Sequence, residues 1–430
     1  MLEENININT NLYSRQIGAY GLETMIKLSK MNIFIYGMRG VGVEVTKNII
    51  LAGPKRVTIY DNNISKINDL TSNFFINEKD VLEEKRRDEA SFPNLLKLNP
   101  YVTLNIMNNS SIIDHLKEKL NIKEEKYDVV VITEFMSKNF IIELNNFCRQ
   151  NKIGFIYGTE LGINGFCFVD FGDNFTVYEK NEEEPKKFIV NSITKGNPGI
   201  VNLFYPINNL SLQDNDYIIF KEIQGMTELN NCSPIKIKVI DKYNVQIIDT
   251  TKFSDYISGG IMIKSTIPLV MNFDSFEKKI EEPYSNKDPY PDQIDFVNPN
   301  TNEIVHIGIL GLCSFYNIKS CLPEINNEND AIELIKLSKN ILIEKENKKE
   351  YWINGLKEET ENFDELFEKT IKNLSLWSKT QISPISSFLG GLIAQEIVKF
   401  TGKFIPIKQW FWCNFSEIML VICGLLYWKI

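Results

Sequence analysis

Residues Gly37–Gly42 are the clearest candidate for a ligand-binding motif in the sequence. They follow an apolar run, Asn32–Tyr36 (NIFIY), and precede a helical pattern that Gly53-Pro54 ends. In a dinucleotide-binding turn of the form GxGxxG, the second glycine lets the backbone approach a pyrophosphate, and the N-terminus of the next helix supplies amide donors. The chemistry expected at such a turn is the binding of nucleotide phosphates.

Arg39 stands at the second-glycine position when Gly37 and Gly42 are aligned with the outer two. Its guanidinium would fill the space that a pyrophosphate needs, so we predict a nucleotide fold without a nucleotide; an Arg39 that swings out to pair with a phosphate remains the alternative. Asp61 follows the next apolar run, 24 residues after Gly37, where a ribose-binding acid is expected. With Arg39 in place, the prediction is that Asp61 orders the following loop.

Composition excludes several classes of protein. The 430 residues predict two or three folding units, and 47 basic against 56 acidic residues give a net charge of −9, the wrong sign for a nucleic-acid partner. Two histidines and no CxxC pair make a metal site and a disulfide framework unexpected. The start MLEENININT lacks the features of a signal peptide, so we expect a cytoplasmic and nuclear protein.

The tail, residues 416–430, has an unusual composition. Its apolar run Ile418–Trp428 has 11 residues, whereas a membrane span needs about 20. We therefore expect no membrane partner and interpret the run as a buried strand or an atypical tail, with a tail anchor as the alternative.

The remaining elements must position the turn. Strand and helix patterns alternate over the first 160 or so residues, which predicts an α/β fold with a doubly wound, mostly parallel sheet. Gly165–Gly172 and Asn174–Lys180 are expected to form a hairpin. Short strands with turn residues predict a small β-barrel domain at 181–268, amphipathic patterns predict a helical bundle at 269–378, and 379–415 return to the first domain.

The helix expected at Ser386–Phe400 should pack back on the first domain, with Gly402 as its stop. Its Gly390-Gly391 pair costs about 1 kcal/mol per glycine relative to alanine, and we expect close packing to compensate. The predicted apolar side consists of Phe388, Leu389, Leu392, Ile393, Ile397 and Phe400.

Motifs spread along the chain resemble the amino-terminal half of a eukaryotic ubiquitin-activating enzyme. They extend from residue 12 to about residue 415 and occur in the family's order. They are LYSRQIGAYG (12–21), GMRGVGVEVTKNIILAG (37–53), NDLTSNFFI (68–76), KGNPGIV (195–201), EIQGMTELN (222–230), DTTKFSDYISGGI (249–261) and PISSFLGGLIAQEIVKFTGKFIPIKQW (384–410).

The resemblance implies a ThiF/MoeB-like, Rossmann-type adenylation domain that is the inactive one of two. Its first part would be 1–180, interrupted by the first catalytic-cysteine half-domain at 181–268 and a four-helix bundle at 269–378, before the return at 379–415. In the active copy an asparagine and an arginine follow the ribose acid, whereas Thr71 and Ser72 stand in those places here.

The family's reaction, by the same resemblance, uses ATP and magnesium to adenylate the modifier's C-terminal carboxylate, which a cysteine then captures as a thioester. This chain would bind neither cofactor and no metal, but would give Arg15 of its YSRQ motif to the ATP site of the active half. A surface Arg15 paired with a carboxylate is the alternative.

The expected partners are the active adenylation half, ubiquitin and, through the complete enzyme, ubiquitin-conjugating enzymes. The family's catalytic-cysteine motif does not occur, so each cysteine is interpreted as a core residue and the chain alone as inactive. The seven are Cys148, Cys167, Cys232, Cys313, Cys321, Cys413 and Cys423.

Two other classes stay open. One is the inactive subunit of a heterodimeric enzyme for another ubiquitin-like modifier, against which the β insert and its FSDYISGG motif argue. The other is a free-standing dinucleotide-dependent oxidoreductase, which Arg39 and the lack of a motif-placed proton donor disfavour.

Overall fold

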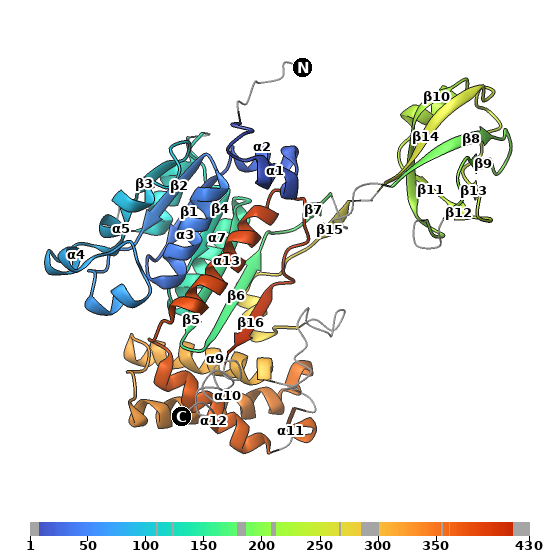
Figure 1. The fold of residues 1–430 in the computed structure, drawn as a ribbon. Coiled ribbons are helices and arrows are strands. Elements are labelled where there is room, and N and C mark those ends of the chain that lie inside the picture. The colour runs from blue at the N-terminus through green and yellow to red at the C-terminus, as the bar shows by residue number, and fades with distance from the viewer. Residues whose placement is uncertain are drawn as a thin grey trace, which may run out of the picture. The chain divides into compact units, whose positions relative to one another are not determined.

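The computed structural model describes residues 8–108, 111–122, 124–178, 186–207, 212–265, 268–284, 301–353, 356–360 and 362–415. They divide into two compact units (Figure 1). The first contains the chain up to Phe175, Asn272–Thr401 and the residues from Pro406, and the second contains Thr176–Met271 and Gly402–Ile405.

A seven-stranded sheet forms the centre of the first unit. Its order is β16-β6-β5-β4-β1-β2-β3, and the strands from β5 to β3 are parallel. The inner strands are short apolar runs buried throughout, as expected of strands covered on both faces. Their bounds are β1 Asn32–Tyr36, β2 Arg56–Tyr60, β3 Thr103–Ile106, β4 Val129–Ile132, β5 Gly154–Leu161, β6 Asn164–Asp170 and β16 Trp410–Asn414.

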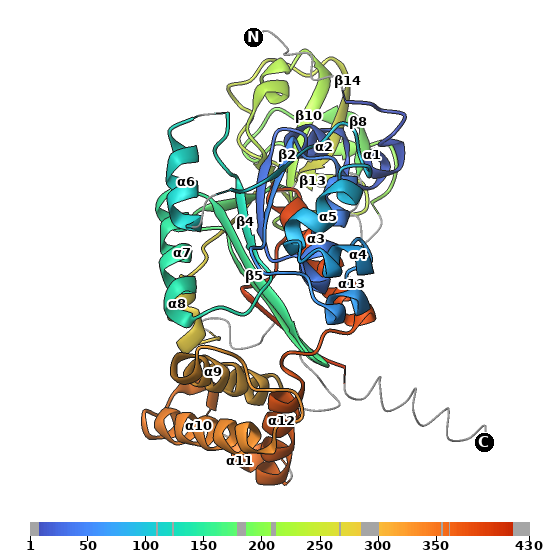
Figure 2. The ribbon, with the colours of Figure 1, turned by 90° about the vertical axis from the view of Figure 1, so that its left-hand side faces the viewer.

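Helices cover both faces of this sheet, with α3, α5 and α13 on one side and α6, α7 and α8 on the other (Figure 2). This arrangement confirms the predicted doubly wound α/β fold class. Around the sheet lie α1 Ser14–Tyr20, α2 Leu22–Leu28, α3 Gly40–Ala52, the 3-10 helix η1 Ile67–Thr71, α4 Glu78–Leu82, α5 Arg87–Leu95, α6 Ile112–Leu120, α7 Lys138–Gln150, α8 Phe276–Glu281 and α13 Ser383–Lys399.

The hairpin predicted from Gly165–Gly172 and Asn174–Lys180 is wrong. β6 instead pairs antiparallel with β5, through a tight turn at Gly162, where φ is +70°. β7, Phe175–Val177, pairs with the distant β15, Leu269–Met271. Local turn residues suggested the pairing of neighbours, but β6 was already occupied on both edges by β5 and β16.

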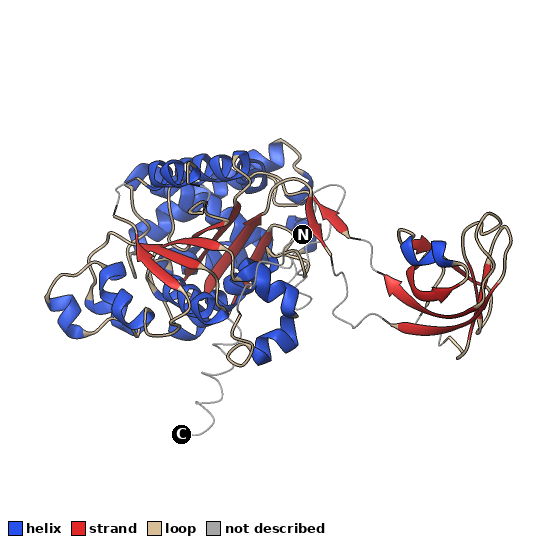
Figure 3. Cartoon of the chain, turned by 90° about the horizontal axis from the view of Figure 1, so that it is seen from above, coloured by secondary structure: helices blue, strands red, loops and turns tan. Residues whose placement is uncertain are grey.

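The second unit is an antiparallel sheet of order β11-β10-β14-β8-β9-β13-β12, curved in Figure 3. Its two outermost strands are joined by the single residue Ile237, so the sheet is nearly closed, and the inserted β-barrel is confirmed. The strands are β8 Lys187–Ile193, β9 Ile200–Leu203, β10 Tyr217–Gln224, β11 Ile235–Lys236, β12 Lys238–Val239, β13 Asn244–Gln246 and β14 Ser258–Ser265, with the 3-10 helix η2 Thr227–Asn231.

A helical bundle in the first unit contains α9, α10 and α12, as predicted from the amphipathic patterns. Their apolar faces meet in a core that includes Leu312, Leu334 and Ile371, each fully buried. The elements are α9 Thr301–Lys319, α10 Glu328–Asn347, the 3-10 helix η3 Tyr351–Ile353, α11 Leu356–Glu359 and α12 Phe363–Trp377.

Helix α13 differs from its predicted packing at two positions. Phe388 is 46% exposed rather than buried on the apolar side, and its ring contacts Phe415 at 5.3 Å. A Cβ on Gly390 would lie 2.4 Å from Glu44 Cβ of α3, which is the expected close packing, but a Cβ on Gly391 would meet no atom within 4 Å. The predicted tail, 416–430, lies outside the described residues, and among those described no helix is long and apolar enough to cross a membrane.

Candidate functional site: a filled glycine turn and an exposed arginine

The glycine turn joins β1 to α3 through very close contacts. Gly37 has φ +97°, and a Cβ there would lie 2.6 Å from Thr133 Oγ1. A Cβ on Gly42 would lie 1.9 Å from the carbonyl oxygen of Gly37. Both outer glycines are therefore required by the geometry of the turn itself, whether or not a ligand binds.

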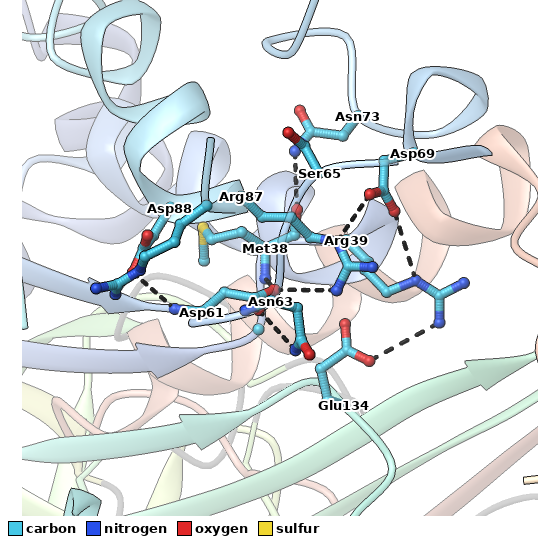
Figure 4. A network of polar contacts seen from close by, with 12 residues as sticks. Met38, Arg39, Asp61, Asn63, Ser65, Asp69, Asn73, Arg87, Asp88 and Glu134 are labelled. Atoms are coloured by element: carbon cyan, nitrogen blue, oxygen red, sulfur yellow. Dashed lines mark hydrogen bonds and ion pairs between the residues drawn. The ribbon is translucent and has the colours of Figure 1, made fainter. Parts of the chain in front are cut away.

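Arg39 lies over this turn and is paired within the chain (Figure 4). Its Nε is 3.9 Å from Asp69 Oδ1, and its Nη1 is 3.8 Å from Glu134 Oε2. Its Nη2 donates a hydrogen bond of 2.9 Å to the carbonyl oxygen of Lys379. The guanidinium is only a quarter exposed, which fits a side chain that fills the turn better than one that swings outward.

Gln381 occupies the amide end of α3. Its Oε1 accepts a hydrogen bond of 2.8 Å from the Gly40 amide, and a second one of 3.3 Å from Ser72 Oγ. Helix N-terminal amides are the donors that a phosphate would use. Ser72, which with Thr71 stands where the resemblance implies an asparagine and an arginine in the active copy, thus helps to hold the neutral Gln381 amide at the start of α3.

Asp61 is fully buried and uses both oxygens to order the loop. Oδ2 accepts from the Met38 amide at 2.9 Å, and Oδ1 accepts from the amide and side chain of Asn63 at 3.0 and 2.9 Å. Oδ2 also lies 3.5 Å from Arg87 Nη1. These contacts support the interpretation of Asp61 as a loop-ordering residue, because they leave it little capacity for a ribose hydroxyl.

A buried ionic cluster surrounds the turn. It contains the carboxylates of Asp61, Asp69 and Glu134 and the guanidiniums of Arg39 and Arg87 (Figure 4). Arg87 Nε donates to Asp69 Oδ2 at 2.8 Å. Burial raises the pKa of Glu134 to about 7, although the nearby Arg39 acts in the opposite direction. Arg39 and Arg87 thus supply cations of the chain that pair with these acids.

Arg15 lies on α1, away from this cluster. Its neighbour Gln16 donates a 3.1 Å hydrogen bond to the carbonyl oxygen of Leu51, near the C-terminal end of α3. The turn is at the other end of α3, whose 13 residues span about 20 Å at 1.5 Å per residue. The side chain is exposed and forms no ion pair or hydrogen bond with any described residue. The alternative of an ion-paired surface arginine is therefore not seen in the described part of the chain.

The structure brings Gly37, Arg39, Gly42 and Asp61 together and leaves Arg15 apart. Gln381 and Glu134 were missed from the sequence, because neither lies in a recognisable motif and both reach the turn through the tertiary fold.

No group of three or more histidine, cysteine, aspartate or glutamate side chains in the described residues could hold a metal ion. The described cysteines are free thiols, of which Cys148, Cys167, Cys313 and Cys413 are buried, Cys232 is half-buried and Cys321 is exposed. Burial raises the pKa of Cys313 to about 12, far from that of a reactive thiolate. Cys423 lies outside the described residues.

Two family models match parts of the chain. The FCCH domain of ubiquitin-activating enzyme E1 matches residues 196–265, and the four-helix bundle of ubiquitin-activating enzyme E1 matches residues 267–342. The first lies within the nearly closed β-sheet unit and the second includes α9 and most of α10.

Curated relatives match nearly the whole chain. Ubiquitin-like modifier-activating enzyme 1 of Oryctolagus cuniculus is 34% identical over 416 residues, which are 96% of this chain and 36% of the relative. Ubiquitin-like modifier-activating enzyme 6 of Homo sapiens is 33% identical over 422 residues, 97% of this chain and 38% of the relative. The chain thus spans a little more than a third of the length of these relatives.

A solved structure of E. coli MccB with MccA is similar at a TM-score of 0.33 and 22% identity, over 38% of this chain and 50% of that one, a likeness too weak to support an argument. The two family models and the relatives together confirm the resemblance: this chain matches the models of the FCCH domain and the four-helix bundle of ubiquitin-activating enzyme E1 and is similar along almost all of its length to roughly the first third of these relatives.

Proposed function

We propose that this chain is the non-nucleotide-binding half of a ubiquitin-activating enzyme. It supports an active adenylation half, in the same polypeptide or in a partner chain, during ATP-dependent adenylation of the ubiquitin C-terminus and thioester formation. On its own the chain is inactive in this reaction, binds neither ATP nor magnesium, and contributes Arg15 to the ATP site of the active half.

The filled turn carries the first part of this proposal. A nucleotide would have to displace Arg39 from two carboxylates and a carbonyl oxygen, and Gln381 from the Gly40 amide. Each displacement leaves a buried or partly buried polar group without its partner, which costs about 1 to 3 kcal/mol per group. These costs therefore favour the turn without a bound nucleotide.

The position of Arg15 supports the second part. An exposed guanidinium, held on a helix at the far end of α3 from the turn, cannot serve the chain's own turn, but it can reach into a neighbouring site. Negative charge builds on the phosphates as pyrophosphate leaves, and a fixed cation stabilises that charge in the transition state. The guanidinium acts as a charge donor and takes up no proton.

The same proposal assigns ubiquitin as the modifier, ubiquitin-conjugating enzymes as partners of the complete enzyme, and the cytoplasm and nucleus as its location. One specific observation keeps another ubiquitin-like modifier as a second candidate. The chain is 33% identical to the activating enzyme 6 of Homo sapiens and 34% identical to the activating enzyme 1 of Oryctolagus cuniculus, so identity does not separate the two types. The filled turn disfavours a dinucleotide-dependent oxidoreductase.

An Arg15→Ala variant tests the proposal in an enzyme that contains the active half. The rate of ATP–pyrophosphate exchange with ubiquitin should fall about 100-fold, the size of loss seen when one transition-state donor is removed. The melting temperature should stay the same, since Arg15 has no described partner to lose. Lys30→Ala, at another exposed cation, is the matched control. An exchange rate unchanged by Arg15→Ala would refute the role of Arg15.

A further inference from the structure

Helix α1, which presents Arg15, gains little of its position from an apolar face, since Ile17 is only half-buried. It has seven residues, and none of them is buried. A helix of this length is not stable alone in water, because its few hydrogen bonds do not offset the cost of nucleation. Whatever fixes α1 on the domain therefore also fixes Arg15.

Tyr13, directly before α1, is the main anchor. Its side chain is 7% exposed, and its hydroxyl accepts a 2.8 Å hydrogen bond from Asn99 Nδ2. The ring lies against Gly53, which ends α3 in the left-handed conformation with φ +88°. A Cβ at Gly53 would lie 2.5 Å from the Tyr13 hydroxyl, so this glycine makes room for the anchor as well as for the turn.

Asn99 connects this anchor to α3. It is 4% exposed, and the same Nδ2 donates a 2.9 Å hydrogen bond to the carbonyl oxygen of Ile50. That carbonyl belongs to the last turn of α3 and also accepts a 3.2 Å hydrogen bond from the Gly53 amide. Asn99 Oδ1 accepts from the Tyr101 amide at 3.1 Å, which fixes the orientation of the side chain. Both hydrogens of Asn99 Nδ2 are thus used, and three hydrogen bonds fix the side chain in place.

Two further contacts hold α1 at points beyond Arg15. Gln16 Nε2 donates to the carbonyl oxygen of Leu51, again in the last turn of α3, and Gln395 Nε2 of α13 donates to the Tyr20 hydroxyl at 2.8 Å. Arg15 therefore lies between an anchor at Tyr13 and one at Tyr20, with its own side chain left in solvent.

We propose that Asn99 is a positioning residue for Arg15, acting through the Tyr13 hydroxyl. The pair sets where α1 begins and so where the guanidinium lies. The effect on adenylation rests on the proposed function of Arg15, whereas the anchoring of α1 involves only contacts within this chain. A guanidinium that must meet a phosphate within hydrogen-bond distance loses much of its effect when its helix shifts by about 1 Å.

Limited proteolysis of this chain tests the anchor, because Arg15 is itself a trypsin site. Cleavage inside a helix requires local opening, so its rate follows the population of the detached state. Tyr13→Phe, which removes only the hydroxyl, and Asn99→Ala should each raise the rate of cleavage after Arg15 about tenfold.

Asn94→Ala is the matched control, since Asn94 donates one hydrogen bond to the Phe75 carbonyl oxygen and none to α1. It should leave cleavage after Arg15 at the wild-type rate. Unchanged cleavage in both Tyr13→Phe and Asn99→Ala would overturn the anchor.

Kinetics in an enzyme with the active half separates positioning from plain stability. Tyr13→Phe should lower kcat for adenylation about five- to tenfold and leave the KM for ATP unchanged. In an Arg15→Ala background the same change should have no further effect, which a merely structural role would not produce. If Arg15→Ala slows the reaction and Tyr13→Phe does not, the positioning proposal alone fails. If Arg15→Ala itself has no effect, the proposed function fails.

Discussion

The side-chain oxygen of Gln381 lies 2.8 Å from the amide nitrogen of Gly40, although 341 residues separate the two. Gly40 opens α3, so this contact places a neutral amide where the positive end of the helix would otherwise attract an anion. Gln381 comes from the segment just before α13, after the β insert and the bundle. A segment that returns to the first domain after the insertions thus covers the amide end of α3 at the glycine turn of that domain.

Arg39 and Gln381 act together in this closure. Arg39 neutralises the acids around the turn, and Gln381 satisfies the helix amide. Both contacts involve the segment that precedes α13, which contains Gln381 and also Lys379, whose carbonyl oxygen accepts from Arg39. The turn is therefore filled by two groups of the chain, one charged and one neutral.

Replacing Arg39 by glycine should destabilise the chain without creating a nucleotide site. Asp69 and Glu134 lose a cation in a mostly buried setting, which should lower the free energy of unfolding by about 2 kcal/mol, discounted for the quarter exposure of Arg39. Gln381 still covers the Gly40 amide. Urea unfolding and an ATP titration of the same variant measure the two effects, and tight ATP binding by Arg39→Gly would show that Arg39 alone excludes the nucleotide.

The adjacent glycines of α13 should respond oppositely to alanine. In Gly390→Ala the new methyl group would overlap Glu44 of α3, and we expect a loss of about 2 kcal/mol. In Gly391→Ala the methyl group meets open space, and the higher helix propensity of alanine should add up to about 1 kcal/mol. Thermal unfolding of the two variants provides the comparison, each serving as the other's control. Equal shifts would contradict the observed packing of α13 on α3.

Stability should depend on pH through Glu160. Burial raises its pKa from 4.5 to about 7, against the opposing hydrogen bonds from Ser386 and the Ile382 amide. A carboxyl with a raised pKa in the folded state stabilises fully below its unfolded value and loses this contribution as pH rises. The loss should fall between about pH 4.5 and 7 and reach about 3 kcal/mol.

Glu160→Gln removes this titration and keeps an acceptor for the Ile382 amide. The difference in unfolding free energy between wild type and Glu160→Gln should therefore change across that pH window and be constant outside it. A difference that is constant from pH 4 to 8 would show that folding does not raise the pKa of Glu160.

The buried thiols should be inert. Cys148, Cys167, Cys313 and Cys413 have pKa values raised mainly by burial, so iodoacetamide at pH 8 should leave them unmodified in the folded chain and react with the exposed Cys321. Peptide mapping with and without urea identifies the sites. Fast labelling of any of the four in the native chain would contradict their interpretation as unreactive core residues.

The position of Arg39 could be predicted from the sequence, because the glycine spacing alone specifies which residue faces the position that nucleotide phosphates occupy in a dinucleotide-binding turn. The alternation of strand and helix patterns similarly predicted the central sheet, whose buried strands are short and apolar. Both inferences rest on patterns that are local in the sequence, a glycine spacing in one case and a succession of short strand and helix patterns in the other. The boundaries predicted for the domains stay predictions.

Contacts between distant segments could not be predicted. Nothing near Gln381 or Glu134 indicates that either meets the turn, since these contacts depend on how α13 and the end of β4 pack. The pairing of β7 with β15 could not be predicted for the same reason. The exposure of Phe388 was also missed, because its spacing in the sequence matches that of the buried residues of α13. Tyr13 and Asn99 likewise lie in unrelated stretches of sequence.

Isothermal titration of the chain with Mg-ATP tests the central claim most directly. We expect no heat of binding up to millimolar ATP, both for the wild-type chain and for the control Lys30→Ala, because Arg39 and Gln381 occupy the place of the phosphates. Saturable binding with a micromolar Kd would contradict the account, since the chain would then bind the nucleotide that Arg39 and Gln381 are proposed to exclude.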